Sequence, residues 1–204
     1  MNDAVLIQQA NADGAYLDHL RLAFPGHADY ARRHAMDYWC MFSDVRPNMP
    51  AKVGGWSKVH LIRDAWRQGY QHIFWVDADA LIVDYTVDLR HALQGSLSEV
   101  GACQHSGHGL PTHLNVGVLY VRPSQSLPRF PELWLAAFPG TKPWMEQGVF
   151  NDLAARLPGV VERLDDRWNS TVGVNVSPRP VVKAWHGYGT PVDRLAAMRR
   201  ELGG

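Results

Sequence analysis

Short apolar runs alternate with segments of helical periodicity through the first 84 residues. The pattern predicts strands at residues 4–9, 37–42 and 72–83 and helices at residues 15–24, 29–36 and 54–70. The helix at 54–70 is the clearest, because Trp56, Val59 and Ile62 recur on one face. Strands that alternate with helices in this way favour a doubly wound α/β arrangement.

The second half of the chain is less regular. The pattern predicts strands at residues 114–123, 160–164 and 180–185 and helices at residues 128–138, 145–157 and 190–202. No internal repeat, low-complexity tract or convincing linker divides the 204 residues. We therefore expect one mixed α/β domain over residues 1–204, with a nucleotide-type half at 1–84 and an irregular half at 85–204.

The composition excludes some partners and says little about others. Twenty basic residues balance twenty acidic ones, so no overall charge favours nucleic acid or a membrane surface as a partner. Cys40 and Cys103 are too few for a disulfide framework, which favours a reducing compartment. We find no signal peptide and no stretch near the ~20 apolar residues of a membrane helix, so we expect a cytoplasmic protein without an intrinsic membrane segment.

The clearest candidate chemistry lies in the segment FWVDADALIV, residues 74–83. Asp77 and Asp79 follow the apolar end of a predicted strand and lie about 7 Å apart if the segment is extended. Ligands of open α/β sheets bind at the carboxyl ends of strands. Paired carboxylates there suit Mg²⁺ or Mn²⁺, which in turn can hold a diphosphate. The alternative is structural, with Asp77 capping a turn or helix and Asp79 solvated.

Five segments follow one another in a recognisable order. They are DYARRHAMDY (29–38), GWSKVHLIRDAWRQGYQHIFWVDADALIV (55–83), LNVGVLYVRPS (114–124), WMEQGVFNDL (144–153) and AWHGYG (184–189). Together they resemble the galactosyl and α-1,6-mannosyltransferase family of GT-A fold glycosyltransferases, with a more distant similarity to glycogenin-type enzymes. The resemblance implies a GT-A type α/β domain with a mixed central sheet and helices on both faces.

The same resemblance implies an activity. The protein would be a metal-dependent, retaining glycosyltransferase that moves a sugar from a nucleotide-sugar, a UDP-sugar, to a carbohydrate or other hydroxyl acceptor. Residues 1–84 would bind the nucleotide, and residues 85–204 would bind the sugar and the acceptor. Asp77, Asp79 and His186 would hold Mn²⁺ or Mg²⁺.

Further roles follow from the matched positions. The residues implied in donor binding are Gln8, Ala10, Asn11, Tyr16, Lys58, Ala78, Asn115, Gly117 and Gly189. Lys58 would also neutralise phosphate charge as the nucleotide leaves. Glu146 and Gln147 fall where the family places a polar group beside the anomeric carbon, as a nucleophile or as a dipole. Without the resemblance, all three would read as ordinary polar residues of helices.

The chain departs from the family pattern in two places. Eukaryotic members carry a membrane anchor and stem that this chain lacks, which leaves open a bacterial or viral relative or an excised catalytic domain. Glycogenin-type enzymes have a lysine shortly after the histidine motif, where this chain offers only Arg194. We expect the histidine-rich segment 103–115 to form a loop that lines the sugar pocket, with a zinc site as the alternative.

Two other functions remain open from the sequence alone. A haloacid-dehalogenase-like phosphatase also has a DxD motif after an apolar strand. That pattern prefers Thr or Val two positions past the second Asp, where this chain has Leu81. A nucleotide-sugar-binding protein without turnover would have the same fold, although the presence of Asp77, Asp79 and His186 argues against it. Release of UDP from a panel of UDP-sugars with Mn²⁺ is the simplest test that distinguishes it from an enzyme.

Overall fold

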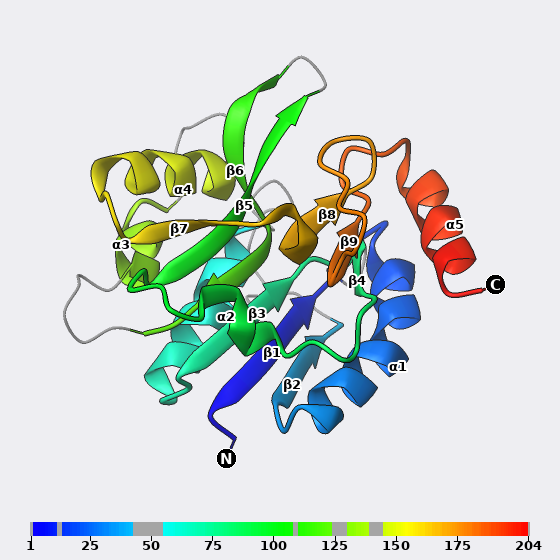
Figure 1. Ribbon diagram of the computed structural model, residues 1–204, viewed down its shortest axis with the longest axis horizontal. Coiled ribbons are helices and arrows are strands. Elements are labelled where there is room, and N and C mark those ends of the chain that lie inside the picture. Colours follow the sequence, from blue (N-terminus) through cyan, green and yellow to red (C-terminus); the bar gives the residue numbers. More distant parts are fainter. Residues whose placement is uncertain are drawn as a thin grey trace.

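The computed structural model describes residues 2–11, 14–42, 55–107, 110–123, 130–138 and 145–203. These residues form one mixed α/β domain in which helices cover both faces of a central sheet (Figure 1). The mixed α/β class and the mixed central sheet expected from the sequence are confirmed.

The central sheet has six strands in the order β2-β1-β3-β6-β5-β7. Their bounds are β1 Ala4–Gln9, β2 Asp37–Met41, β3 His72–Val76, β5 Val100–Gly107, β6 Leu110–Val121 and β7 Val161–Leu164. β1 runs parallel to β2 and β3, β6 runs antiparallel to β3 and β5, and β7 runs parallel to β5. The three parallel strands therefore come from the first half of the chain, as its sequence pattern predicts.

Two layers cover this sheet. The helices are α1 Leu17–Arg33, α2 Trp56–Arg67, α3 Phe130–Ala136, α4 Met145–Arg156 and α5 Pro191–Glu201. α2, α3 and α4 pack on one face, where Trp56, Trp134 and Phe150 are fully buried. The opposite face packs against α1, two 3₁₀ segments (η2 Leu89–Leu93 and η3 Asp166–Asn169) and a small sheet. That sheet has the order β4-β9-β8, from Ala80–Ile82, Val182–Ala184 and Ser170–Thr171.

Helix α1 corrects one sequence-based prediction. The pattern predicts two helices, at 15–24 and 29–36, whereas the structure has a single helix with Pro25 inside it. The buried face runs past the proline without interruption, at Leu20, Ala23, His27, Tyr30 and Ala31. Burial of that face outweighs the backbone hydrogen bond that proline cannot make.

Two further segments differ from their predictions. The predicted strand 72–83 is two strands in different sheets, because β3 ends at Val76 and β4 begins at Ala80. The segment 103–115, expected to be a loop, forms facing parts of β5 and β6 instead. Its tip, with His108 of the zinc alternative, lies outside the described residues.

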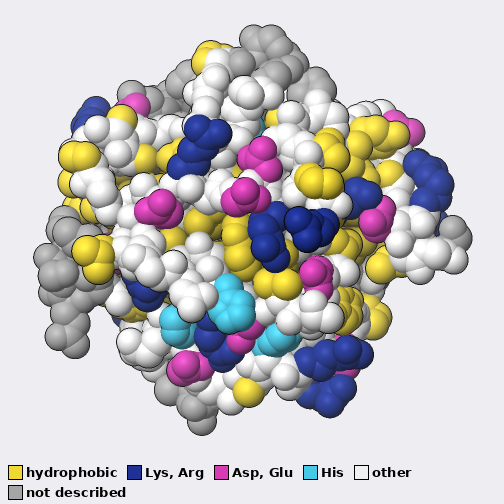
Figure 2. Space-filling model, viewed as in Figure 1, with side chains coloured by type: hydrophobic (Ala, Val, Ile, Leu, Met, Phe, Trp, Pro, Cys, Tyr) yellow, Lys and Arg dark blue, Asp and Glu magenta, His cyan; other side chains and the backbone are white. Residues whose placement is uncertain are grey.

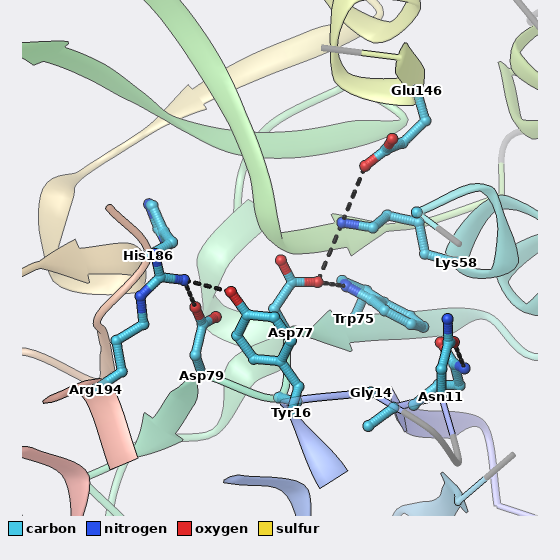
Figure 3. A pocket seen from close by; sticks show the side chains of 14 residues that line it. Asn11, Gly14, Tyr16, Lys58, Trp75, Asp77, Asp79, Glu146, His186 and Arg194 are labelled. Atoms are coloured by element: carbon cyan, nitrogen blue, oxygen red, sulfur yellow. Dashed lines mark hydrogen bonds and ion pairs between the residues drawn. The ribbon is translucent and has the colours of Figure 1, made fainter. Parts of the chain in front are cut away.

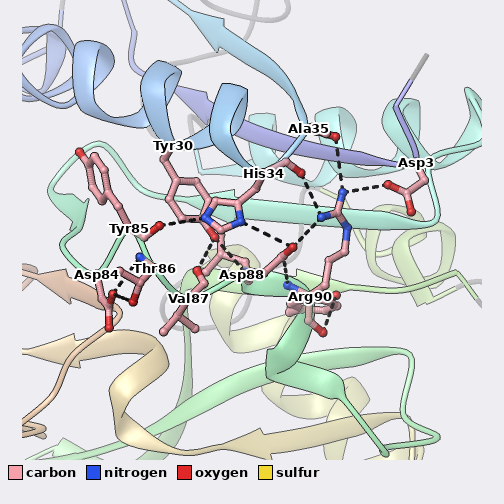
Figure 4. Close-up of polar contacts among 12 residues, drawn as sticks. Asp3, Tyr30, His34, Ala35, Asp84, Tyr85, Thr86, Val87, Asp88 and Arg90 are labelled. Carbon is pink, nitrogen blue, oxygen red and sulfur yellow. Dashed lines mark hydrogen bonds and ion pairs between the residues drawn. The ribbon is translucent and has the colours of Figure 1, made fainter.

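A polar cluster joins α1 to the segment that follows β4. Arg90 donates hydrogen bonds to the carboxylates of Asp88 and Asp3 at 2.7 and 2.9 Å and to the backbone oxygen of His34 at 3.1 Å (Figure 4). The hydroxyl of Tyr30 donates to the backbone oxygen of Val87 at 2.8 Å. These contacts connect the residues just before β1 and β2, and helix α1, to residues 87–90, which follow β4.

The surface reflects the balanced composition. Acidic and basic side chains intermix on the face shown in Figure 2, in a chain with twenty of each.

Cys40 and Cys103 are both free thiols. Among the helices in the described part of the chain, none is both long and apolar enough to cross a membrane.

His27 of α1 is a fully buried histidine that links three elements. Its Nε2 accepts a hydrogen bond from the backbone N–H of Ile82 at 2.9 Å, and its Nδ1 lies 2.7 Å from Oε1 of Gln8. Because a backbone N–H can only donate, the ring is neutral and carries its proton on Nδ1. Burial lowers the pKa of His27 to about 3.

This contact predicts a pH-dependent stability. The unfolded chain gains a proton on His27 below pH 6.5, whereas the folded protein does so only near pH 3, so the free energy of unfolding should fall as the pH drops through this window. Between pH 7 and pH 5 the loss from this residue is about 2 kcal/mol. Urea denaturation at these two pH values measures it.

The matched variants are His27→Gln and His91→Gln. Glutamine at position 27 keeps a donor and an acceptor but does not titrate, so this variant should lose less stability between pH 7 and pH 5. His91 is exposed, and its replacement should leave the wild-type pH dependence intact. Equal pH dependence of the wild type and His27→Gln would contradict the prediction.

Candidate functional site

Two adjoining cavities open at the carboxyl ends of β1 and β3. The first has a volume of about 390 Å³ and the second of about 310 Å³. Four side chains line both cavities: Lys58, Asp77, Glu146 and His186. Figure 3 shows three of them, Lys58, Asp77 and Glu146, in line across the first cavity.

Asp77 stands where β3 leaves the central sheet. Its backbone N–H donates to the backbone oxygen of Gly117 in β6 at 2.7 Å. Its Oδ1 accepts hydrogen bonds from Nε1 of Trp75 at 2.6 Å and from Nζ of Lys58 at 3.1 Å. Two donors on one oxygen fix the carboxylate, and Oδ2 is directed at the space above Gly117.

Lys58 comes from the first turn of α2 and is buried between two carboxylates. Its Nζ lies 3.1 Å from Asp77 Oδ1, 3.7 Å from Glu146 Oε1 and 3.0 Å from the backbone oxygen of Val116. Burial opposes the positive charge, but Asp77 and Glu146 outweigh it and hold the pKa of Lys58 above its ordinary value. The ammonium group is therefore a fixed positive charge at the boundary between the two cavities.

Asp79 is buried, and a residue of the C-terminal helix counters its charge. Nη1 of Arg194 in α5 donates to Asp79 Oδ2 at 3.0 Å and to the hydroxyl of Tyr16 at 2.6 Å (Figure 3). Burial and the neighbouring Asp77 raise the pKa of Asp79 to about 6, although Arg194 opposes the shift. The basic residue that the sequence offers after the histidine motif thus lies in the first cavity.

His186 reaches the cavity because β9 pairs with β4. The register sets Ala184 opposite Ala80, and the backbone N–H of Trp185 donates to the backbone oxygen of Asp79 at 3.0 Å. This pairing places Asp77 and Asp79, which precede β4, next to His186, which follows β9. Burial and the nearby His105 lower the pKa of His186 well below its ordinary value, so the ring is neutral.

Two atoms that could bind a divalent cation, Asp77 Oδ2 and His186 Nδ1, border the space above Gly117. A Cβ on this glycine would lie 3.1 Å from Asp77 Oδ2 and 3.5 Å from His186 Nδ1, so the space exists only because residue 117 has no side chain. His186 Nδ1 is a buried atom without a hydrogen-bond partner among the described residues. An open imidazole nitrogen beside a carboxylate oxygen is a ligand pair that Mn²⁺ accepts.

Asp79, the third expected cation ligand, forms an ion pair instead. Asp79 pairs with Arg194, and in the described ranges no three His, Cys, Asp or Glu side chains form a ready metal-binding cluster. The structure therefore brings Asp77, Asp79 and His186 to one cavity without closing them around a common point.

The second cavity holds Asn115, Gly117 and Gln147, which were expected to contact the donor sugar or act on it. Asn115 Oδ1 accepts a hydrogen bond from the N–H of Gly117 at 2.7 Å, and its Nδ2 donates to Gln147 Oε1 at 3.4 Å. The same glutamine oxygen accepts the N–H of Val116 at 3.3 Å. These bonds hold the Gln147 amide against β6, at the wall of the cavity.

Helix α4 carries Gln147 and Glu146 to the site. The side-chain amide of Asn151 anchors this helix, because it bonds both the N–H and the backbone oxygen of Leu114, at 2.8 and 2.9 Å. The Glu146 carboxylate lies against Gly55 at the start of α2. Burial raises the pKa of Glu146, and Lys58 opposes the shift.

Most residues expected to bind the donor line these cavities. The first cavity is bordered by Ala10, Asn11, Tyr16, Lys58 and Ala78, and the second by Lys58, Asn115 and Gly117. The structure brings these positions together from β1, the segment before α1, α2, the turn after β3, and β6.

Two of the expected donor-binding residues, Gln8 and Gly189, line neither cavity. Gln8 is fully buried behind the cavity wall, where its Oε1 accepts from Tyr38 and its Nε2 lies 3.5 Å from the backbone oxygen of Asp77. It supports the Asp77 turn from behind, and its neighbour Gln9 lines the cavity instead. Gly189 lies outside both cavities, beside the first turn of α5.

Sequence reasoning missed several residues around the site. Trp75 had a usable signal, because alternate residues of a strand share a face and Trp75 and Asp77 are two apart. Thr171 and Asn169, which lie behind the second cavity, had none. They contact His105 and Asn115 across 66 and 54 positions, and such pairs arise only from the packing of segments that are far apart in the chain.

A family model matches the first half of the chain. The model of the galactosyl transferase GMA12/MNN10 family matches residues 3–99, which is just under half of the chain and includes β1, α2, β3 and both aspartates. A search of the curated proteins finds no match to the sequence.

Solved structures of glycosyltransferases share the fold. A glycosyltransferase involved in the glycosylation of the major capsid of PBCV-1 has 14% identity and a TM-score of 0.73, over 97% of this chain and 98% of that one. Mouse xyloside xylosyltransferase 1 has 10% identity and a TM-score of 0.56, over 89% and 96%. The glycosyltransferase GlyE of Streptococcus pneumoniae TIGR4 has 11% identity and a TM-score of 0.57, over 98% and 63%. The described residues therefore have the GT-A fold of these glycosyltransferases, and the first half of the chain resembles the galactosyl transferase GMA12/MNN10 family.

Proposed function

We propose that the protein transfers a sugar from a UDP-sugar to a hydroxyl group of a glycan acceptor, with retention of anomeric configuration and with dependence on Mn²⁺ or Mg²⁺. The observation that carries this proposal is the position of the Asp77 carboxylate. It lies between Lys58 and the open nitrogen of His186, where the two cavities meet. A diphosphate bound there would have the Lys58 ammonium on one side and, on the side of His186, the charge of the cation that Asp77 and His186 would hold.

The donor would span both cavities. The base and ribose would occupy the first, against Ala10, Asn11 and Tyr16 of the nucleotide half, residues 1–84. The sugar would occupy the second, where Asn115 and Gln147 of the second half offer polar groups for its hydroxyls. The diphosphate would then lie at the shared wall, beside Asp77.

Asp77, Asp79 and His186 would hold the divalent cation, with Ala78 as the small residue between the two aspartates. The cation supplies charge that offsets the diphosphate oxygens when the donor binds. Arg194 faces the same cavity. Its Nη1 bonds Asp79 and Tyr16 and its Nε donates to the backbone oxygen of Tyr188, so its Nη2 is the nitrogen that can donate to a phosphate oxygen. It would therefore do the work of the lysine found after the histidine motif in glycogenin-type enzymes.

The transfer step would use the leaving diphosphate as the base. The bond between the anomeric carbon and the phosphate oxygen breaks, and the acceptor hydroxyl forms its new bond on the same face of the sugar. The acceptor proton passes to the departing phosphate oxygen, so no separate protein base is required. Lys58, which is held charged by Asp77 and Glu146, stabilises the negative charge on that oxygen.

On the opposite face of the sugar, a protein group must stabilise the positive charge that develops at the anomeric carbon. Gln147 and Glu146 are the candidates, since both line the second cavity. Glu146 is tied to Lys58 and packs against Gly55, whereas Gln147 lies beside Asn115. We assign the role to Gln147, as a dipole, and this assignment makes a covalent intermediate unnecessary.

Removing the Asp77 charge should abolish most activity. Asp77→Asn should lower the rate of transfer by on the order of 10²-fold, because the amide is a weaker cation ligand and a poorer partner for Lys58. UDP release from a panel of UDP-sugars with Mn²⁺ measures this, and chelation by EDTA should have a comparable effect. The exposed Asp18→Asn is the control. Full activity of Asp77→Asn, or of the wild type in EDTA, would refute metal dependence.

Replacing Arg194 should weaken the reaction without unfolding the domain. We expect Arg194→Ala to lower kcat/KM by on the order of 10²-fold through loss of a phosphate donor, and Arg194→Lys to recover part of that loss because it keeps the charge. Arg199→Ala, an exposed residue of the same helix, should match the wild type. Thermal unfolding of each variant checks that α5 stays docked. Wild-type kcat/KM in Arg194→Ala would remove this residue from the site.

The stereochemical course tests the transfer step directly. Proton NMR of the first-formed product should show an α-linkage from an α-linked donor, and a β-linkage would overturn retention. Gln147→Ala should keep slow, measurable transfer, because a dipole helps the reaction without forming a bond. Glu146→Gln should lose nearly all transfer activity only if Glu146 is the nucleophile. That result would contradict our assignment of Gln147.

A further inference from the structure

A line of hydrogen-bonded side chains lies behind the second cavity. It joins Asn115 of β6, Asn169 of η3, Thr171 of β8 and His105 of β5 to His186, which follows β9. Asn169 and Thr171 are fully buried, and His105 and Asn115 nearly so. Buried polar groups of this kind are expected to satisfy one another, so each donor and acceptor can be assigned in turn.

The assignment begins at a backbone amide. The N–H of Gly117 can only donate, and it lies 2.7 Å from Asn115 Oδ1, which fixes the orientation of that side-chain amide. Nδ2 of Asn169 also donates to Asn115 Oδ1, at 2.9 Å. The amide of Asn169 is thereby oriented too, and its Oδ1 is directed at Thr171.

The orientation of the Thr171 hydroxyl determines which nitrogen of His105 is protonated. Its hydroxyl lies 3.4 Å from Asn169 Oδ1, and this buried oxygen can only accept, so the hydroxyl proton is donated to it. The hydroxyl oxygen is then left as an acceptor, 3.3 Å from Nε2 of His105. A neutral His105 that donates from Nε2 carries no proton on Nδ1.

The last link reaches His186. Its Nε2 lies 3.1 Å from His105 Nδ1 and also 3.1 Å from Thr171 Oγ1, and both of these atoms are acceptors by the preceding steps. The two imidazole rings are nearly parallel, with an interplanar angle of 17°. Nε2 of His186 is therefore the protonated nitrogen, and the lone pair is on Nδ1.

We infer that His105 is a positioning residue that holds His186 in the tautomer with an unprotonated Nδ1, the atom that borders the space above Gly117 together with Asp77 Oδ2. The inference rests on the proposed function for its purpose, since a cation ligand needs an unprotonated nitrogen. The hydrogen-bond assignment itself rests only on the Gly117 amide and the four side chains between it and His186. Ligating histidines are commonly oriented through their other ring nitrogen in this manner.

The tautomer can be measured in the metal-free protein. Long-range ¹H–¹⁵N correlation spectra distinguish a protonated ring nitrogen from an unprotonated one, and His186→Gln identifies the signals of His186. We expect one tautomer in the wild type, protonated on Nε2. His105→Leu should show both tautomers and bind Mn²⁺ about 10- to 100-fold more weakly, as measured by the electron spin resonance of free Mn²⁺.

Matched variants separate positioning from simple packing. His105→Asn places an amide oxygen near the former Nδ1 and should keep most of the wild-type tautomer and Mn²⁺ affinity. His91→Gln, an exposed histidine far from the site in sequence, should change neither. If His105→Leu does not fold, Thr171→Val breaks the same line of hydrogen bonds with a side chain of equal shape and is judged by the same two measurements.

The possible failures are distinguishable. A wild-type His186 protonated on Nδ1 would overturn the role of His105, and so would a folded His105→Leu with the wild-type tautomer and Mn²⁺ affinity. A wild type that shows the Nε2-protonated tautomer and binds no Mn²⁺ would overturn the proposed metal dependence instead, and it would leave the hydrogen-bond assignment standing.

Discussion

The structure depends on how two neighbouring carboxylates are compensated where a buried strand leaves its sheet. Desolvation opposes a charge there, and two like charges oppose each other. Asp77 is compensated by Lys58 and Trp75 on one oxygen, and Asp79 by Arg194. The first turn of α2 and the first turn of α5 must therefore both face the end of β3, and this requirement shapes the cavity.

The contacts of Arg194 also connect the C-terminal helix to the N-terminal part of the chain. It joins α5 to Tyr16, 178 positions earlier, and to the aspartate of the β3–β4 turn. Because Asp79 is buried, losing its only nearby guanidinium among the described residues would leave a strongly disfavoured charge.

Glycine at position 117 has a different role from the compensating charges. Its backbone oxygen accepts from Asp77, its N–H fixes Asn115, and its missing side chain leaves the space between Asp77 and His186. Any Cβ would come within 3.1 Å of both the Asp77 and the Asn115 oxygens. One residue thus supports the aspartate, directs the hydrogen-bonded line to His105 and keeps the proposed cation position open.

The sequence alone determined the elements and the chemistry but not how they meet. Apolar periodicity is a local property, so it predicted the parallel strands, the α2 helix and the strand end at which Asp77 and Asp79 stand. It failed where distant contacts decide: Pro25 stays inside α1, residues 72–83 divide between two sheets, and residues 103–115 pair as strands. The contacts of Arg194 and His105 also depend on segments far apart in the chain, because only the pairing of β9 with β4 and the docking of α5 bring them to the cavity.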